Sequence, residues 1–204
     1  MNKLGVVGSG ALAKAVCWRL LECGYPVLVW GPDANGVAEC VRSGAATAAV
    51  PSDLAAQATV VIVAAEDGAE SERWQLGDHG VVTSLAERGV VVDMTTMSPT
   101  QSRRLARAYE EMGGRYLDAP ISGGAPAART GNLVMMIGGP ESAFDAVLPV
   151  LEKLGRVIVR MGETGSGSIA KLCNQAMCFV NLCGVCEALS LGAKAGIDLR
   201  KLFS

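Results

Sequence analysis

Residues 4–16, Leu-Gly-Val-Val-Gly-Ser-Gly-Ala-Leu-Ala-Lys-Ala-Val, decide the fold. They begin with a short apolar strand over 4–7, pass through a glycine turn, and enter a helix over 11–23 with apolar residues at helical spacing. Gly24 ends this helix, and a second apolar strand follows over 26–30. The stretch therefore predicts one βαβ unit.

The turn fits the pattern G-x-G-x-x-G/A, with alanine in the last position. Its first two glycines allow a tight turn and close approach of the backbone to a pyrophosphate, whose charge is stabilised at the N-terminus of the following helix. Glycine turns also occur as plain connections, but here the strand, helix and next strand follow in the required order. The residues predicted to contact a dinucleotide at this turn are Gly8, Ser9, Gly10, Ala11 and Leu12.

Further apolar segments continue this alternation along the chain. Strands are predicted over 60–64, 90–94, 116–119, 133–137 and 157–160, and helices over 101–112 and 141–154. The pattern indicates an α/β protein with a Rossmann-type, doubly wound and mostly parallel sheet covered by helices on both faces.

The sequence Gly-Glu-Thr-Gly-Ser-Gly at 162–167 interrupts the alternation before a long helix predicted over 168–195. We divide the chain into a dinucleotide-binding domain, 1–163, and the first part of an incomplete helical domain, 164–204. The long helix is apolar on most of its faces, so further helical sequence or a second chain must cover it. We therefore expect a homodimer or a higher homo-oligomer.

The composition limits the function classes. A net charge of −2 without a Lys/Arg run argues against nucleic acid or an anionic membrane as partner, and Asn174, Asn181 and Glu187 interrupt the long helix too often for a membrane span. Four of seven cysteines lie in this helix without histidines at ligand spacing, so we expect core thiols and no metal site. With no secretory signal visible, we expect a cytoplasmic protein.

The preference between NAD and NADP is read after the second strand, at Trp30-Gly31-Pro32-Asp33. An acidic residue there holds the ribose hydroxyls of NAD, whereas an arginine accommodates the 2′-phosphate of NADP. Asp33 fits the first role or ordinary turn chemistry, and no arginine follows Trp30. The sequence allows NAD or NADP and mildly favours NAD.

Two loops follow predicted strands at the edge where open α/β sheets bind ligands. Thr95 and Thr96 end one strand, shortly before Ser98, a predicted helix N-cap. After another strand, Ser122-Gly123-Gly124 could present a hydroxyl and backbone N–H groups to a carboxylate, or form a glycine-rich loop without a ligand.

Lys171 and Asn174 are three positions apart, so they share one face of the long helix. A buried lysine with a lowered pKa can give a proton to a carbonyl oxygen while an amide orients that oxygen or the lysine. The alternative is a solvated lysine near the start of a helix.

Four motifs in order, GVVGSGALAKAV, VVDMTTMSP, DAPISGGAPAARTGNLVMMIGG and GSGSIAKLCNQ, resemble the β-hydroxyacid dehydrogenase family. The family includes 3-hydroxyisobutyrate dehydrogenase and tartronate semialdehyde reductase, and the resemblance extends over essentially the whole chain. It implies that Ser122, Gly123 and Gly124 hold a substrate carboxylate, that Lys171 is the general acid/base, and that Asn174 assists it.

The resemblance further implies that Thr96 and the loop at Ala65 and Glu66 touch the cofactor. The family carries a leucine-proline pair where this chain has Ala65-Glu66. The implied activity is hydride transfer between a nicotinamide cofactor and a short 3-hydroxy acid or its semialdehyde, with a helical C-terminal domain closing the site, often across a dimer. The alternatives are an imine reductase-like enzyme of the same superfamily, in which the catalytic lysine is usually replaced, and a non-catalytic dinucleotide-binding or scaffolding module.

Overall fold

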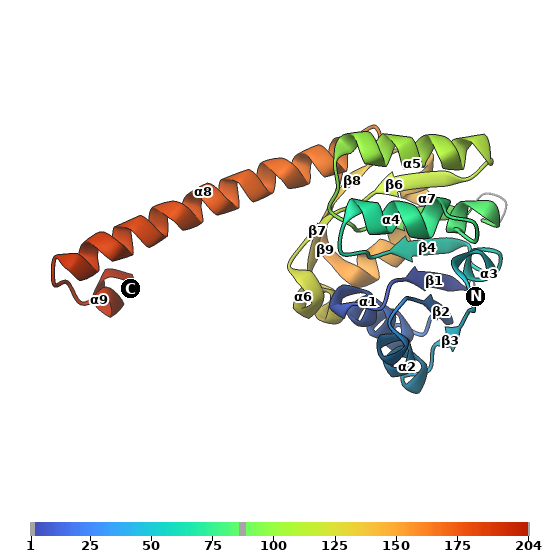
Figure 1. Ribbon diagram of the computed structural model, residues 1–204, viewed down its shortest axis with the longest axis horizontal. Coiled ribbons are helices and arrows are strands. Elements are labelled where there is room, and N and C mark those ends of the chain that lie inside the picture. Colours follow the sequence, from blue (N-terminus) through green and yellow to red (C-terminus); the bar gives the residue numbers. More distant parts are fainter. Residues whose placement is uncertain (1–2, 86–88, 204) are drawn as a thin grey trace.

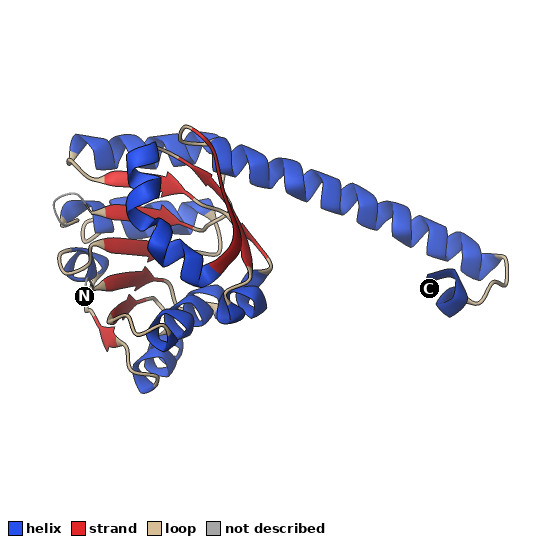
Figure 2. Ribbon diagram, turned by 180° about the vertical axis from the view of Figure 1, so that it is seen from behind, coloured by secondary structure: helices blue, strands red, loops and turns tan. Residues whose placement is uncertain are grey.

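The computed structural model describes residues 3–85 and 89–203, which form one mixed sheet with helices on both faces (Figures 1 and 2). The strand order is β3-β2-β1-β4-β5-β6-β8-β7, with β9 paired to β8. The strands are β1 Leu4–Val7, β2 Val27–Trp30, β3 Ala46–Thr47, β4 Val60–Val63, β5 Val90–Asp93, β6 Arg115–Asp118, β7 Ile121–Ser122, β8 Leu133–Gly138 and β9 Gly155–Gly162.

Strands β3 to β6 in this order are parallel, and β8 then runs antiparallel to β6 and β7. The order on the two sides of the β1/β4 pair runs in opposite directions along the chain, as in a doubly wound sheet. The predicted Rossmann-type fold is confirmed.

The helices are α1 Ala11–Glu22, α2 Ala34–Arg42, α3 Pro51–Ala55, α4 Gly68–Leu76, α5 Pro99–Glu111, α6 Gly124–Thr130, α7 Glu141–Leu154, α8 Ser166–Lys194 and α9 Leu199–Phe203, and a 3₁₀ turn spans Val81–Thr83. One core lies between the sheet and α1, α2, α6 and α7, and the other lies under α3, α4 and α5. Successive strand residues face opposite cores: Ile62 of β4 packs in the first and Val61 and Val63 in the second. This explains why the central strands are continuous runs of buried valine and isoleucine.

Helix α8 extends away from the sheet and carries α9 at its far end (Figure 1). Among its described residues only Gly167, Ser168 and Gly192 are buried, whereas large apolar side chains such as Phe179 and Val180 are 63% and 72% exposed. By length and composition alone α8 could cross a membrane, so its polar residues do not exclude a span, contrary to the expectation from the sequence, although the core helix of a globular protein passes the same test.

The four cysteines of α8 are exposed in this chain, so the prediction of core thiols is wrong for the chain by itself. Within the described residues, little else packs on α8 beyond its first turns and its contact with α9. The helix has the composition of a buried element, yet among the residues that the structure describes no surface covers most of its length.

Candidate active site

The glycine turn connects β1 to α1, and the residue that follows β4 packs closely against it. Gly8 has a φ of 139°, and a Cβ there would lie 2.5 Å from the carbonyl oxygen of Ala64 and 3.0 Å from the Cβ of Ala13. Only glycine meets both conditions, and the small side chain of Ala13 lets α1 approach the strand. The turn is therefore built as the sequence pattern requires.

The N-terminus of α1 follows directly. Gly10 is its N-cap, without a side-chain hydrogen bond to the first turn, and Ala11 is exposed while Leu12 is half-buried. The first backbone N–H groups of a helix need an outside acceptor and attract negative charge. This geometry fits the pyrophosphate of a dinucleotide.

Ser9 and Asp33 fix the start of α2 beside the turn. The backbone N–H of Asp33 donates to Ser9 Oγ over 3.1 Å. The Asp33 carboxylate accepts from Asn35 N at 3.1 Å and Gly36 N at 2.9 Å, as the N-cap of α2. The capping alternative for Asp33 is thus observed, and its contact with a ribose stays a prediction.

The loops after β4 and β5 are held together by a hydrogen bond. Ala65 N donates to Thr95 Oγ1 over 3.1 Å, and Thr95 N donates to Asp93 Oδ1 over 2.9 Å. Thr95 is buried, whereas Thr96 and Glu66 are exposed beside it in their loops. Thr95 therefore builds the loop, while Thr96 and Glu66 are free to contact a ligand.

Asp93, at the end of β5, is the centre of a buried polar network. Its Oδ2 accepts from Ser71 Oγ at 2.7 Å, Gln75 Nε2 at 2.7 Å and Tyr116 Oη at 3.2 Å. Burial raises the pKa of Asp93, and the hydrogen bonds that it accepts from Ser71 and Thr95 oppose that rise. The network ties α4 to the loop that carries Thr95.

The loop after β6 meets α8 at a cluster of three side chains. Lys171 Nζ donates to Ser122 Oγ over 3.2 Å, and Ser122 Oγ donates to Asn174 Oδ1 over 3.1 Å. Lys171 is half-buried, and this desolvation lowers its pKa. Gly123 and Gly124, with φ of 108° and 61°, turn the chain directly after Ser122 into α6. The structure thus brings together the loop and helix residues that the sequence proposed as one site.

Asp118 fastens the start of α8 to the sheet. Its two carboxylate oxygens accept from Gly165 N at 2.7 Å and Ser168 N at 2.8 Å. A Cβ on Gly167 would lie 2.4 Å from the carbonyl oxygen of Met136, so only glycine allows this approach. Burial raises the pKa of Asp118, against the lowering effect of these hydrogen bonds. The anchor places Lys171 one turn further along the helix.

The roles of Asp93 and Asp118 were not predicted from the sequence. Asp93 ends the apolar strand β5, Asp118 ends β6 directly after Tyr116 and Leu117, and both residues are 1% exposed. A buried carboxylate needs hydrogen-bond donors, so this pattern was a usable signal.

The loops named above follow β1, β4, β5 and β6, so they lie along the carboxyl edge of the parallel strands. This edge beside the β1/β4 reversal is where doubly wound sheets bind ligands.

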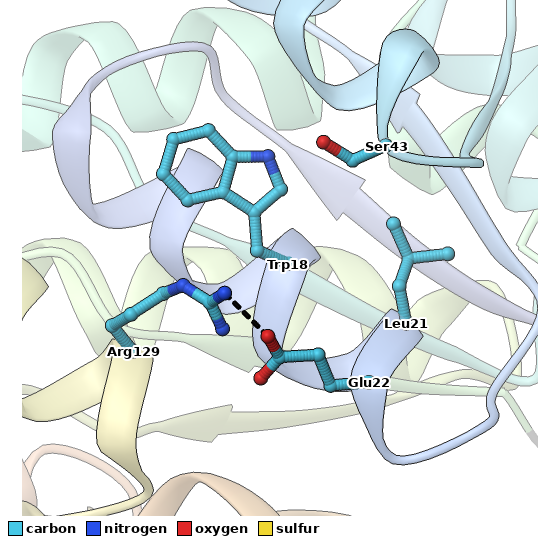
Figure 3. A pocket seen from close by; sticks show the side chains of 5 residues that line it. All are labelled: Trp18, Leu21, Glu22, Ser43 and Arg129. Carbon is cyan, nitrogen blue, oxygen red and sulfur yellow. Dashed lines mark hydrogen bonds and ion pairs between the residues drawn. The ribbon is translucent and has the colours of Figure 1, made fainter.

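A separate open pocket of about 550 Å³ lies where α1 and α6 face the end of α2 (Figure 3). There Arg129 forms an ion pair with Glu22, and its guanidinium carbon lies 5.8 Å from the ring centre of Trp18. None of the residues that line this pocket is a predicted site residue.

Comparison with known proteins places this architecture in a family. Residues 3–162 match the NAD binding domain of 6-phosphogluconate dehydrogenase, and residues 165–204 match the NAD-binding family of NADP-dependent 3-hydroxyisobutyrate dehydrogenase. The chain is also 34% identical over 198 residues to 2-hydroxy-3-oxopropionate reductase of Escherichia coli, covering 96% of this chain and 67% of that one. The chain belongs to the β-hydroxyacid dehydrogenase family.

The relatives of this family member are longer than the chain itself. Rat mitochondrial 3-hydroxyisobutyrate dehydrogenase is 32% identical over 199 residues, which is 98% of this chain but 59% of the relative. The solved structure of Mycobacterium tuberculosis 3-hydroxyisobutyrate dehydrogenase with L-serine superposes with a TM-score of 0.93 at 28% identity, covering 100% of this chain and 69% of that one. The chain thus spans about three fifths to two thirds of such proteins.

An imine reductase from Myxococcus stipitatus has a TM-score of 0.89 at 24% identity, covering 98% of this chain and 69% of that one, and shares the fold. The resemblance to the β-hydroxyacid dehydrogenases is confirmed, and the matched domains indicate a nicotinamide cofactor. The preference between NAD and NADP and the roles of single residues stay predictions.

Proposed function

We propose that the protein is an oxidoreductase that transfers a hydride between a nicotinamide cofactor and a short 3-hydroxy acid or its semialdehyde. The two hydrogen bonds that link Ser122 to Lys171 and to Asn174, at the ligand-binding edge of the sheet, carry this proposal. It unites a proton donor with groups that can hold an oxygen-rich substrate. The names of the hydroxyacid dehydrogenase relatives support the same chemistry.

Lys171 serves as the general acid/base. In the reductive direction its ammonium donates a proton to the carbonyl oxygen, and in the oxidative direction the neutral amine accepts the hydroxyl proton. A bound nicotinamide ring supplies or accepts the hydride. Desolvation lowers the pKa of Lys171, which makes the neutral amine more accessible near neutral pH than it is for an ordinary lysine. Asn174 orients the reacting oxygen or the lysine.

The loop Ser122-Gly123-Gly124 holds the substrate carboxylate. It offers one hydroxyl and two backbone N–H groups next to the lysine, and successive N–H groups in a turn form a concave anion site. Anchoring the carboxylate here fixes the distance from the reacting carbon to Lys171.

The turn from Gly8 to Leu12 would hold the pyrophosphate of the cofactor, and Thr96 and the loop at Ala65 and Glu66 would lie next to it. The small residues and free helix N-terminus suit the pyrophosphate. We favour NAD over NADP, because no arginine follows Trp30 and because Asp33, shortly after β2, is an acidic residue of the kind that holds the ribose hydroxyls of NAD.

The apolar surface of α8 supports a homo-oligomer, in which a second copy or further helical sequence covers Phe179, Val180 and their neighbours. Oligomeric state and a cytoplasmic location stay predictions.

The test is oxidation of NADH and NADPH with three sets of compounds: short aldehydes that carry a carboxylate, matched aldehydes without it, and a cyclic imine. The proposal expects turnover of the first set, with NADH preferred. Turnover of the imine alone would favour an imine reductase-like enzyme. Cofactor binding without turnover of any compound would favour the non-catalytic binding module.

A further inference from the structure

Glu66 lies over the glycine turn. A Cβ built on Gly10 would be 2.8 Å from Glu66 Oε1, so the carboxylate occupies the space that a side chain at position 10 would take. The absence of that side chain is what allows a pyrophosphate to approach the backbone in dinucleotide-binding turns. The Glu66 carboxylate therefore lies in the space that a bound pyrophosphate would need.

The N-terminus of α1 favours a negative group, and both Glu66 and a pyrophosphate are negative. Gly10 is the N-cap of α1, whose N-terminus is free of a side-chain cap and attracts one negative group. The Glu66 carboxylate, so close to Gly10, is one negative group that this N-terminus favours. A pyrophosphate that arrives must replace it and, if Glu66 stays, suffers repulsion from a like charge.

The backbone of the loop is fixed while this side chain is exposed. Glu66 N donates to Glu70 Oε2 over 3.0 Å, and the preceding Ala65 N donates to Thr95 Oγ1. The side chain of Asp67 caps α4 through Glu70 N at 2.8 Å. In the parts of the chain that are described, the Glu66 carboxylate has no ion-pair partner. It can therefore rotate without breaking a salt bridge.

We propose that Glu66 is a determinant that weakens cofactor affinity: its carboxylate competes with the dinucleotide pyrophosphate for the N-terminus of α1 and must turn away when the cofactor binds. This inference rests on the proposed function. It concerns the pyrophosphate and not the nicotinamide, so it applies to any ligand that carries an adenosine diphosphate group.

The experiment is an equilibrium titration of the purified protein, the Glu66→Gln variant and the Glu152→Gln variant with NADH and with ADP-ribose. Glu152 is exposed on α7, away from the turn, so its variant controls for the change in net charge. Glu66→Gln should bind both ligands about fivefold more tightly at low salt, the size expected for one charge at a helix N-terminus. The gain should shrink as added salt screens the carboxylate. Glu152→Gln should bind like the wild type.

Unchanged or weaker binding by Glu66→Gln overturns the inference. So does a gain for NADH without a gain for ADP-ribose, because Glu66 would then act at the nicotinamide end. Failure of the wild type to bind either ligand would overturn the proposed function itself, and this inference with it. Binding by the wild type without a gain in the variant overturns the inference alone.

Discussion

Lys171 Nζ donates a hydrogen bond to Ser122 Oγ over 3.2 Å, across 49 positions of the sequence. The contact exists because Asp118, at the end of β6, holds the first turn of α8 against the same strand edge from which the Ser122 loop departs. The loop and the helix therefore form one site, and several consequences can be measured.

The pH dependence of the reaction should follow Lys171. Reduction needs the ammonium form, so its rate should fall as pH rises through the pKa of Lys171, whereas oxidation needs the neutral amine and should become faster. Because desolvation lowers this pKa from its ordinary value of 10.5, both inflections should lie below that value. Initial rates in both directions across pH would show this, and an inflection that moves the same way in both directions would contradict it.

Ser122→Ala should weaken substrate binding more than cofactor binding. The change removes the acceptor of Lys171 and the donor to Asn174, and hydrogen bonds to charged groups contribute about 1.5–3 kcal/mol, which is roughly tenfold or more in KM. Steady-state kinetics and an NADH titration separate the two effects. Ser142→Ala, at an exposed site on α7, is the control. Equal losses in both affinities would argue against a carboxylate site in this loop.

Asp118→Asn should loosen the start of α8. An amide can accept one of the two N–H groups, from Gly165 and Ser168, but its NH₂ faces the other, and an unsatisfied buried donor costs about 1–3 kcal/mol. Urea unfolding and faster hydrogen exchange at these two amides would report the change. The exposed Asp145 on α7 provides a matched Asp145→Asn control, and equal stability of the two variants would contradict the anchoring role.

Gly8→Ala should cost more stability than Gly44→Ala. Both glycines have positive φ, 139° and 107°, but a Cβ on Gly8 would meet the Ala64 carbonyl oxygen at 2.5 Å, whereas one on Gly44 would meet nothing within 4 Å. The steric clash should add about 1–3 kcal/mol to the shared backbone strain. Denaturation midpoints of the two variants test this, and similar losses would show that the turn can relax.

Much of the fold was predictable because the central strands are buried on both faces. Such strands appear in sequence as continuous apolar runs, and β1, β4 and β5 agree with their predictions within a residue. Helix α2 was missed because Pro-Asp-Ala-Asn-Gly reads as a turn. The Asp33 side chain accepts from N–H groups two and three residues on, and that chemistry is shared by turns and helix N-caps.

Helix α4 has few apolar residues, and its contribution to the core comes largely from Trp74 and the buried polar pair Ser71 and Gln75. Their partner is Asp93, which a pattern of apolar spacing does not reveal. The antiparallel direction of β8 relative to β6 could not be predicted from the sequence either, because β7 has only two residues and shows no periodicity.

The site residues at Ser122, Lys171 and Asn174 were predictable as a group because each lies next to a distinct local signal, a glycine loop or a helix face. Asp93 and Asp118 could be recognised as acidic residues that end strands, but their donors in α4 and α8 could not be predicted, since these come from segments far away in sequence. For Asp33, the sequence left two roles open, and the structure shows the capping one.

The most direct test of the account is the rate of hydride transfer in Lys171→Ala, measured in single turnovers with saturating NADH and a carboxylate-bearing aldehyde, alongside NADH affinity. The account predicts a loss of about 10²- to 10⁴-fold in the rate, the usual contribution of a general acid, with NADH affinity unchanged. A loss of only a few-fold would contradict the role of Lys171 and the proposed reaction with it.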